Sequence, residues 1–237
     1  MEKLLLRKPT PKMKVAIFVE NQSIMSLVNP IVEPVGYPVQ TEAVPDYLVK
    51  EEIEGIKFYY KGYKQVLNKT KKPEDIMGCS SLQSFIIEYL HTILILANVH
   101  KRYRIFTNES GNHFAHRSNM QFDIALYDKT ILTGDKITRQ YVQGFPPTLV
   151  IEIDLDVELE GTGLKTSEDF LKFRTRNLLK YGVQRVLWIL TKPKKVLIVE
   201  GETWLFEDWD KDIEALDGVT FNIAKYLEQE GVNPDNL

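Results

Sequence analysis

Two apolar segments with the length of β-strands carry acidic residues, and they constrain the fold more than any other feature of the chain. Residues 122–127 read Phe-Asp-Ile-Ala-Leu-Tyr and include Asp123. Residues 149–154 read Leu-Val-Ile-Glu-Ile-Asp and include Glu152 and Asp154. Strands this apolar are normally buried, and a buried carboxylate is costly unless it has a partner. The sequence therefore predicts a buried sheet that holds three acids.

Glu152 and Asp154 are two residues apart, so a strand would project both side chains from one face. Two like charges that close repel each other unless a cation or a proton lies between them. Together with Asp123, the pair favours a metal site. An edge strand with a wet polar face would explain any one of these acids equally well.

The segment that follows predicts a helix with one inward-facing cation. Residues 166–182 begin with suitable N-terminal caps and end with a glycine stop. At about 100° per residue the apolar side chains form one stripe, and Arg174 falls near its middle. A buried guanidinium requires paired acids, and the preceding strand offers Glu152 and Asp154. The alternative is an arginine whose stem packs while its charged head reaches water.

The order of the patterned segments predicts an α/β (α+β) domain with a mixed sheet flanked by helices. A hairpin is expected within residues 56–67 and a long helix at about residues 80–99. Residues 1–45, with a short strand at 14–20 and several prolines, are expected to be an N-terminal extension. Residues 46–237 would then form the main domain.

Composition fits one soluble domain. A chain of 237 residues that is 43% hydrophobic can bury one substantial core. Its single cysteine, Cys79, excludes an intrachain disulfide framework, and the longest apolar stretch, residues 85–97, is too short to cross a bilayer. The apolar run at residues 1–6 is too short for a secretory signal. We therefore expect a cytoplasmic protein.

The order of these segments resembles the PD-(D/E)XK nuclease superfamily. The matching stretches are residues 121–127, residues 146–154 with the pattern Pro-Pro-x-x-Val-Ile-Glu-Ile-Asp, and residues 168–189. More narrowly, about residues 46–206 resemble the Uma-type restriction-endonuclease-like family of bacterial proteins. The resemblance implies a restriction-endonuclease-like fold, with a mixed central sheet flanked by helices.

Two positions depart from the pattern of that group. The third position of the usual Glu-x-Lys signature is Asp154 here, and Arg174 stands where the family commonly has lysine. Arginine keeps the charge and can clamp a phosphate, but it does not lose a proton near neutral pH. A general-base role is therefore not expected of Arg174, whereas electrostatic stabilisation or orientation of water remains open.

The resemblance adds one secondary candidate. Many nucleases of this superfamily carry an acid on the first core helix that reaches the metal site, and Glu88 is the only acid of the expected long helix. Alternatively, Glu88 and His91 share one side of that helix because they mark its solvent stripe.

Acid placement, the inward Arg174 and the resemblance together predict a Mg²⁺- or Mn²⁺-dependent endonuclease that hydrolyses DNA. Asp123 and Glu152 would bind the metal with the carbonyl of Ile153, since hard oxygen ligands suit Mg²⁺. Asp154 would orient the attacking water or a second ion, and Arg174 would stabilise developing charge.

The alternative function is a catalytically silent nuclease-like domain that binds nucleic acid or a protein partner. The departures at Asp154 and Arg174 are what a decayed site would look like. If Arg174 only pairs with Glu152 or Asp154, no metal is needed.

Charge and aromatic content bear on partners. The net charge is -3, but residues 165–195 hold nine Lys or Arg against two acids, a stripe that would attract the phosphates of DNA. Near the C-terminus, Trp204, Phe206 and Trp209 predict exposed aromatic surface of the kind found at interfaces. A homodimer is therefore expected.

Overall fold

The structure, a computed structural model, describes residues 44–154 and 156–233. All of them lie within one compact unit, Gln40–Leu237. The expected N-terminal extension, with its strand at residues 14–20, lies outside the described residues except for its last two positions. Within the described ranges, no helix is long and apolar enough to cross a membrane.

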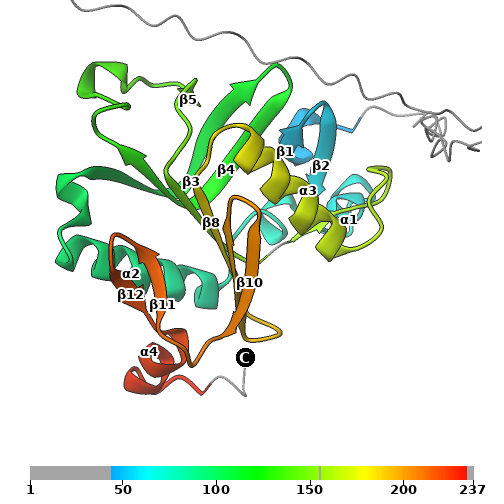
Figure 1. Cartoon of the computed structure of the whole chain (residues 1–237). Coiled ribbons are helices and arrows are strands. Elements are labelled where there is room, and N and C mark those ends of the chain that lie inside the picture. Colours follow the sequence, from blue (N-terminus) through cyan, green and yellow to red (C-terminus); the bar gives the residue numbers. More distant parts are fainter. Residues whose placement is uncertain (1–43, 155, 234–237) are drawn as a thin grey trace, which may run out of the picture. The chain divides into compact units, whose positions relative to one another are not determined.

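A mixed sheet of ten strands organises the described part of the chain (Figure 1). Along its main path the strands are β10 (Thr203–Asp208), β9 (Lys195–Glu200), β8 (Arg185–Leu190), β6 (Leu149–Ile153), β4 (Ser118–Asp128), β1 (Val49–Ile53), β2 (Ile56–Tyr60) and β7 (Val157–Glu158). Off this path, β3 (Tyr103–Ala115) pairs with β4 and with β5 (Val142–Gln143), while β11 (Ile213–Leu216) and β12 (Val219–Phe221) form a separate hairpin. The β6–β8 and β3–β5 pairs are parallel and the other pairs are antiparallel. The predicted mixed sheet is confirmed.

Helices cover both faces of this sheet, which is why β6 is buried along its whole length. The helices are α1 (Tyr63–Leu67), α2 (Ser81–Leu96), α3 (Ser167–Lys180) and α4 (Ile223–Gln229), with short 3-10 turns at Asp46–Leu48, Pro73–Asp75, Val99–Lys101 and Gly134–Lys136. Side chains of α2 and α4 pack in one core cluster, and side chains of α3 pack in a second. Ile151 and Ile153 belong to the first cluster and Val150 to the second. Because side chains alternate along a strand, Glu152 shares the face of Val150, toward α3.

Two β-bulges interrupt the ladders beside the acid-bearing strands. In β3, the two residues Asn108 and Glu109 lie opposite the single residue Asp123 of β4. In β1, Lys50 is the extra residue, opposite the step between residues 58 and 59 of β2. A bulge bends its strand and redirects the side chains around it. Both bulges therefore change which side chains face the acids.

The prediction of a hairpin within residues 56–67 is wrong. The chain instead turns at Glu54 and Gly55, between β1 and β2, and residues 63–67 form α1. Glu54 and Gly55 have φ values of 50° and 83°, the left-handed conformation that a two-residue hairpin turn requires. Tyr63 and Val66 are buried together one helical turn apart, a spacing that a short apolar run does not distinguish from a strand.

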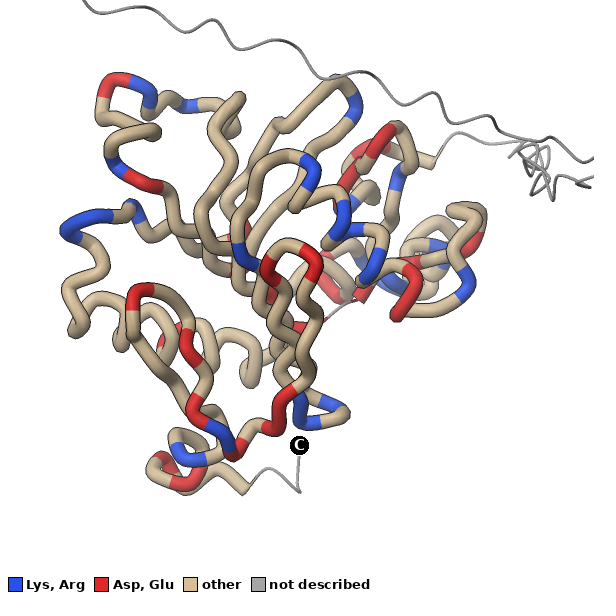
Figure 2. The backbone as a smooth tube through the Cα atoms, viewed as in Figure 1, with Lys and Arg blue, Asp and Glu red and all other residues tan. Residues whose placement is uncertain are grey.

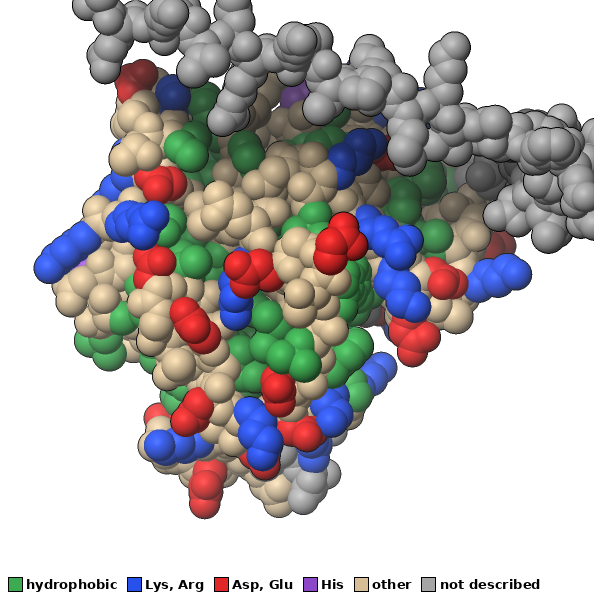
Figure 3. Space-filling view, viewed as in Figure 1, with side chains coloured by type: hydrophobic (Ala, Val, Ile, Leu, Met, Phe, Trp, Pro, Cys, Tyr) green, Lys and Arg blue, Asp and Glu red, His purple; other side chains and the backbone are tan. Residues whose placement is uncertain are grey.

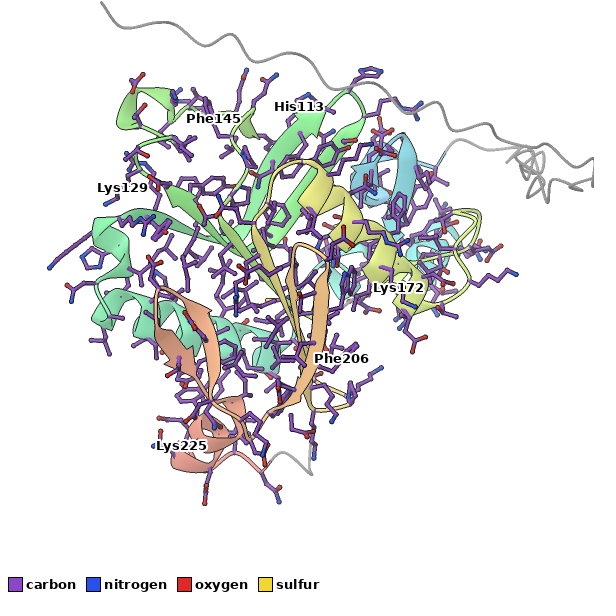
Figure 4. All side chains as sticks on the ribbon, in the orientation of Figure 1. His113, Lys129, Phe145, Lys172, Phe206 and Lys225 are labelled. Atoms are coloured by element: carbon purple, nitrogen blue, oxygen red, sulfur yellow. The ribbon has the colours of Figure 1, made fainter. Side chains whose placement is uncertain are left out.

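The C-terminal aromatic residues differ in exposure. Trp209 is 3% exposed and belongs to the core, so it does not contribute the predicted surface. Trp204 is half-buried, whereas Phe206 is 58% exposed and its neighbour Leu205 is 46% exposed. Figure 3 shows a hydrophobic area over β10, and Figure 4 labels Phe206 on that strand. Of this C-terminal segment, the exposed apolar surface thus lies on the strand that ends the sheet's main path.

Candidate active site

Asp123 is fixed where β4 meets β6 and the start of α2. The residue is 6% exposed. Its Oδ2 accepts a hydrogen bond from the backbone N–H of Ile153 at 2.8 Å, and its Oδ1 accepts one from Nε2 of Gln83 at 2.8 Å. Burial raises the pKa of Asp123 above its ordinary value, while the two hydrogen bonds and the charges of Lys50 and Arg174 oppose that shift. The backbone of the strand that carries Glu152 therefore also positions Asp123.

The local structure of α3 turns Arg174 toward the sheet, as predicted. Thr166 and Asp169 form a capping box that starts the helix. Trp188 of β8 donates a hydrogen bond from Nε1 to Oγ1 of Thr175 at 2.8 Å, which ties the helix to the sheet. Arg174 is 4% exposed, and its guanidinium lies 5.3 Å from the centre of the Trp188 ring.

Arg174 joins two carboxylates from different strands. Its Nη1 lies 2.8 Å from Oε1 of Glu152, and its Nε donates a hydrogen bond to Oε2 of Glu51 at 3.0 Å. Its Nη2 donates to the backbone carbonyl of Gln121 at 2.7 Å. Glu152 is 7% exposed and Glu51 is 6% exposed, so this is a buried cluster of two acids and one cation. The alternative in which the guanidinium reaches water is excluded.

Glu51 is a site residue that the sequence analysis did not predict. It lies on β1, two residues before Ile53, and both are buried. Because residues two apart on a strand face the same side, the apolar Ile53 was the available signal that Glu51 points inward. Its contact with Arg174 joins residues 123 positions apart in sequence, so no local pattern identified the partner.

Burial and neighbouring charges shift the pKa values of Glu152 and Arg174 in this cluster. The pKa of Glu152 is raised to about 8, mainly by burial and also by Asp123 and Glu51, while Arg174 opposes the shift. Burial alone would lower the pKa of Arg174, but the facing carboxylates of Glu152 and Glu51 outweigh it and the net shift is upward. Oε1 of Glu152 is close to Arg174 but lacks a well-aligned hydrogen bond. One guanidinium therefore does not fully compensate the buried acids around it.

Asp154 lies beyond the strand that carries Glu152, so the predicted strand alternation does not apply to it, although both residues line one cavity. β6 ends at Ile153, and Asp154 takes a left-handed conformation with φ of 59°. Its Oδ1 accepts a hydrogen bond from the N–H of Thr191 at 2.7 Å, and its Oδ2 accepts one from the Thr191 hydroxyl at 2.6 Å. The strict two-residue alternation holds only within a strand, and this residue lies one position beyond it.

Glu88 is not brought to the site. It is exposed on α2, on the stripe that the alternative interpretation assigned to solvent. The residue of α2 that reaches the acids is Gln83, in the first turn of the helix, through its bond to Asp123. The first turn of α2, and not its middle, is therefore next to the middle of β4, where Asp123 lies.

A cavity of about 70 Å³ opens beside these residues. Its carboxylates are Glu51, Glu109, Asp123, Glu152, Asp154 and Asp156, and its cations are Lys50 and Arg174. The volume exceeds the roughly 10–15 Å³ that one water needs. An acidic space of this size favours cationic ligands or water.

The donor chemistry of the site fits a magnesium ion. Asp123 and Glu152 offer hard carboxylate oxygens, and the under-paired Oε1 of Glu152 is a buried acceptor. Across residues 44–154 and 156–233, no group of three or more His, Cys, Asp or Glu is arranged to hold an ion. Mg²⁺ commonly takes only one or two protein carboxylates and keeps several waters. Asp123 and Glu152 are therefore the residues that would hold it.

Comparisons with known proteins agree with the fold. No protein-family model matches the chain, and no curated protein matches it significantly. Among solved structures, it is similar to a protein from Anabaena variabilis described as a candidate nuclease belonging to DUF820, with a TM-score of 0.51 and 15% sequence identity. The match covers 75% of this chain and 88% of that one. The chain thus has the mixed, restriction-endonuclease-like fold that its sequence pattern predicts.

Proposed function

We propose that this protein is a magnesium-dependent endonuclease that hydrolyses phosphodiester bonds in DNA. One observation carries the proposal: the buried carboxylates of Asp123 and Glu152 come from neighbouring strands and line one acidic cavity. The fold shared with a protein described as a candidate nuclease supports it. Buried acids of this kind, with raised pKa values in a cavity, are characteristic of functional sites.

Each residue of the site has a defined role in this proposal. Asp123 and Glu152 would hold the ion, which when bound would polarise the phosphate and lower the pKa of an attacking water. The water oxygen bonds to phosphorus and gives up one proton to solvent, the bond to the leaving oxygen breaks, and that oxygen takes up a proton from solvent. Arg174 holds Glu152 and Glu51 in place, and Asp154 ties the end of β6 to Thr191.

A basic groove supports DNA as the partner. Lys165, Lys172 and Arg176 line an open groove on the outer side of α3, together with one acid, Asp169. Figure 2 shows basic residues along this helix, and Figure 4 labels Lys172 there. Clustered lysine and arginine side chains bind phosphates in a salt-dependent manner. This groove is suited to a nucleic-acid backbone.

Metal binding is tested by calorimetric titration with Mn²⁺ and Mg²⁺, and metal-dependent cleavage is tested by a plasmid-cleavage assay. We expect the wild type to bind Mn²⁺ and to nick DNA, and Glu152→Gln to lose binding and to cleave at least about 100-fold more slowly, because the ion loses a charged ligand. The exposed Glu202→Gln is the matched control and should behave as wild type. Wild-type protein that neither binds millimolar metal nor cleaves DNA or RNA contradicts the proposal.

A second function is favoured by one observation, the engagement of Arg174. Its Nε, Nη1 and Nη2 each face a protein oxygen, from Glu51, Glu152 and Gln121 respectively. An arginine already engaged with protein oxygens in this way suits a catalytically silent domain that binds nucleic acid or a protein. Retained DNA binding with no metal binding in the titration would select this function over the enzyme.

We also propose that the protein forms a homodimer through β10. The exposed Leu205 and Phe206 lie on this terminal strand of the sheet, where an unpaired edge favours strand addition. Light scattering at micromolar concentration should give twice the monomer mass of 27.5 kDa. Phe206→Glu should shift the mass toward the monomer, whereas a strictly monomeric wild type refutes the proposal.

A further inference from the structure

Two cationic side chains line the acidic cavity, and they differ in the contacts that they make with other protein groups. All three nitrogens of the Arg174 guanidinium face protein oxygens. Lys50 lines the same cavity and is half-buried. Within the described part of the chain, no carboxylate lies at ion-pair distance from its ammonium, whose nearest aromatic contact is the Tyr60 ring, with the ring centre 5.8 Å away. Lys50 therefore has charge and donors available to a ligand.

The bulge in β1 explains how Lys50 comes to face the acids. In a regular strand, Lys50 and Glu51 would point to opposite faces of the sheet. Both of them line the cavity, because Lys50 is the extra residue of the bulge and shifts the alternation by one. Bulges are enriched beside active sites for this reason. The irregularity of β1 thus places a cation next to Asp123 and Glu152.

The charges that line the cavity indicate what Lys50 contributes there. The cavity is lined by six carboxylates and two cations, so a DNA phosphate entering it meets net repulsion. A metal ion compensates part of that repulsion. A lysine ammonium on a flexible stem, with three donors and no protein carboxylate to hold it, supplies a second compensating charge.

We propose that Lys50 donates a hydrogen bond to a non-bridging oxygen of the scissile phosphate and stabilises the negative charge that develops there. This inference rests on the proposed function, because it names the residue of that site which receives the phosphate. The role is one of positive charge, so arginine should replace lysine in it.

The test uses the full chain and three variants, Lys50→Met, Lys50→Arg and Lys57→Met. Lys57 is the matched control, since it lies on the same hairpin, pairs with Asp46 at 2.9 Å and does not line the cavity. Binding of a short fluorescein-labelled DNA duplex is measured by anisotropy with Ca²⁺ over a range of salt concentrations. Cleavage of the same duplex is measured under single-turnover conditions with Mn²⁺, and thermal unfolding establishes that each variant folds.

We expect Lys50→Met to bind the duplex about tenfold more weakly, with the salt dependence reduced by about one phosphate contact. Cleavage should slow by about 100-fold, because one donor to the developing charge is lost. Lys50→Arg should restore most of the DNA binding and most of the cleavage rate, and Lys57→Met should match the wild type in both measurements. If Lys50→Met does not fold, Lys50→Gln replaces it in the same binding and cleavage measurements.

The outcomes separate this inference from the nuclease proposal. A folded Lys50→Met that binds and cleaves as the wild type does overturns the inference. A loss that Lys50→Arg fails to restore also overturns it, because positive charge is then not what Lys50 supplies. A wild type that binds the duplex through Lys50 but never cleaves it upholds the phosphate contact of Lys50, and it overturns both the nuclease activity and the stabilising role of Lys50 in that reaction. A wild type that does not bind DNA overturns both.

Discussion

Arg174→Ala is expected to lower the free energy of unfolding by about 3–5 kcal/mol, because it leaves buried carboxylates without their cation. Glu51 and Glu152 are each less than 10% exposed and both contact this guanidinium. The substitution also removes the donor to the carbonyl of Gln121. Urea denaturation at neutral pH measures the change.

Controls for this prediction come from the same helix. Lys172 and Arg176 are exposed on α3, and their substitution by alanine should change the free energy of unfolding by less than about 0.5 kcal/mol. Arg174→Lys should be intermediate, because it keeps the charge but loses the planar set of donors. An Arg174→Ala protein as stable as Lys172→Ala would show that the buried cluster contributes nothing to the fold.

The stability of the metal-free protein is expected to fall as pH rises from about 5 to about 8, by on the order of 2–4 kcal/mol from Glu152 alone. Burial raises the pKa of this carboxyl from 4.5 to about 8. Between those values the folded protein holds a proton that the unfolded chain has released, so each rise in pH favours unfolding. One unit of pKa shift corresponds to about 1.4 kcal/mol. Asp123, whose pKa burial also raises, contributes with the same sign.

Glu152→Gln isolates this effect, because glutamine does not titrate. Denaturation in the presence of a chelator, at several pH values, should show a smaller decline for Glu152→Gln than for the wild type. Glu202→Gln, an exposed control, should decline as the wild type does. Parallel curves for Glu152→Gln and the wild type would mean that Glu152 is ionised in the folded protein throughout this range.

Several features of the site could be predicted because they depend on neighbours within a few residues. The burial of β6 follows from a continuous apolar run, and the orientation of Arg174 follows from its place in the apolar stripe of α3. The mixed sheet follows from the order of strand and helix patterns. Asp123 and Glu152 could be identified as buried acids by the same reasoning.

Other features were decided only by pairing between distant segments. Glu51 meets Arg174 across 123 positions, and the extra residue Lys50 becomes visible only when β1 is aligned with β2. The partner of the Asp154 carboxylate is Thr191, which follows β8 and lies 37 positions away.

The sequence by itself therefore determined the strands, the helix and the acids that they bury, since periodicity is a local property. Only the tertiary structure decided that Glu51 shares Arg174 with Glu152 and that Lys50 lines the same cavity. Strand ends, bulges and ion-pair partners are set by contacts between residues far apart in the chain, and no pattern within one segment records them.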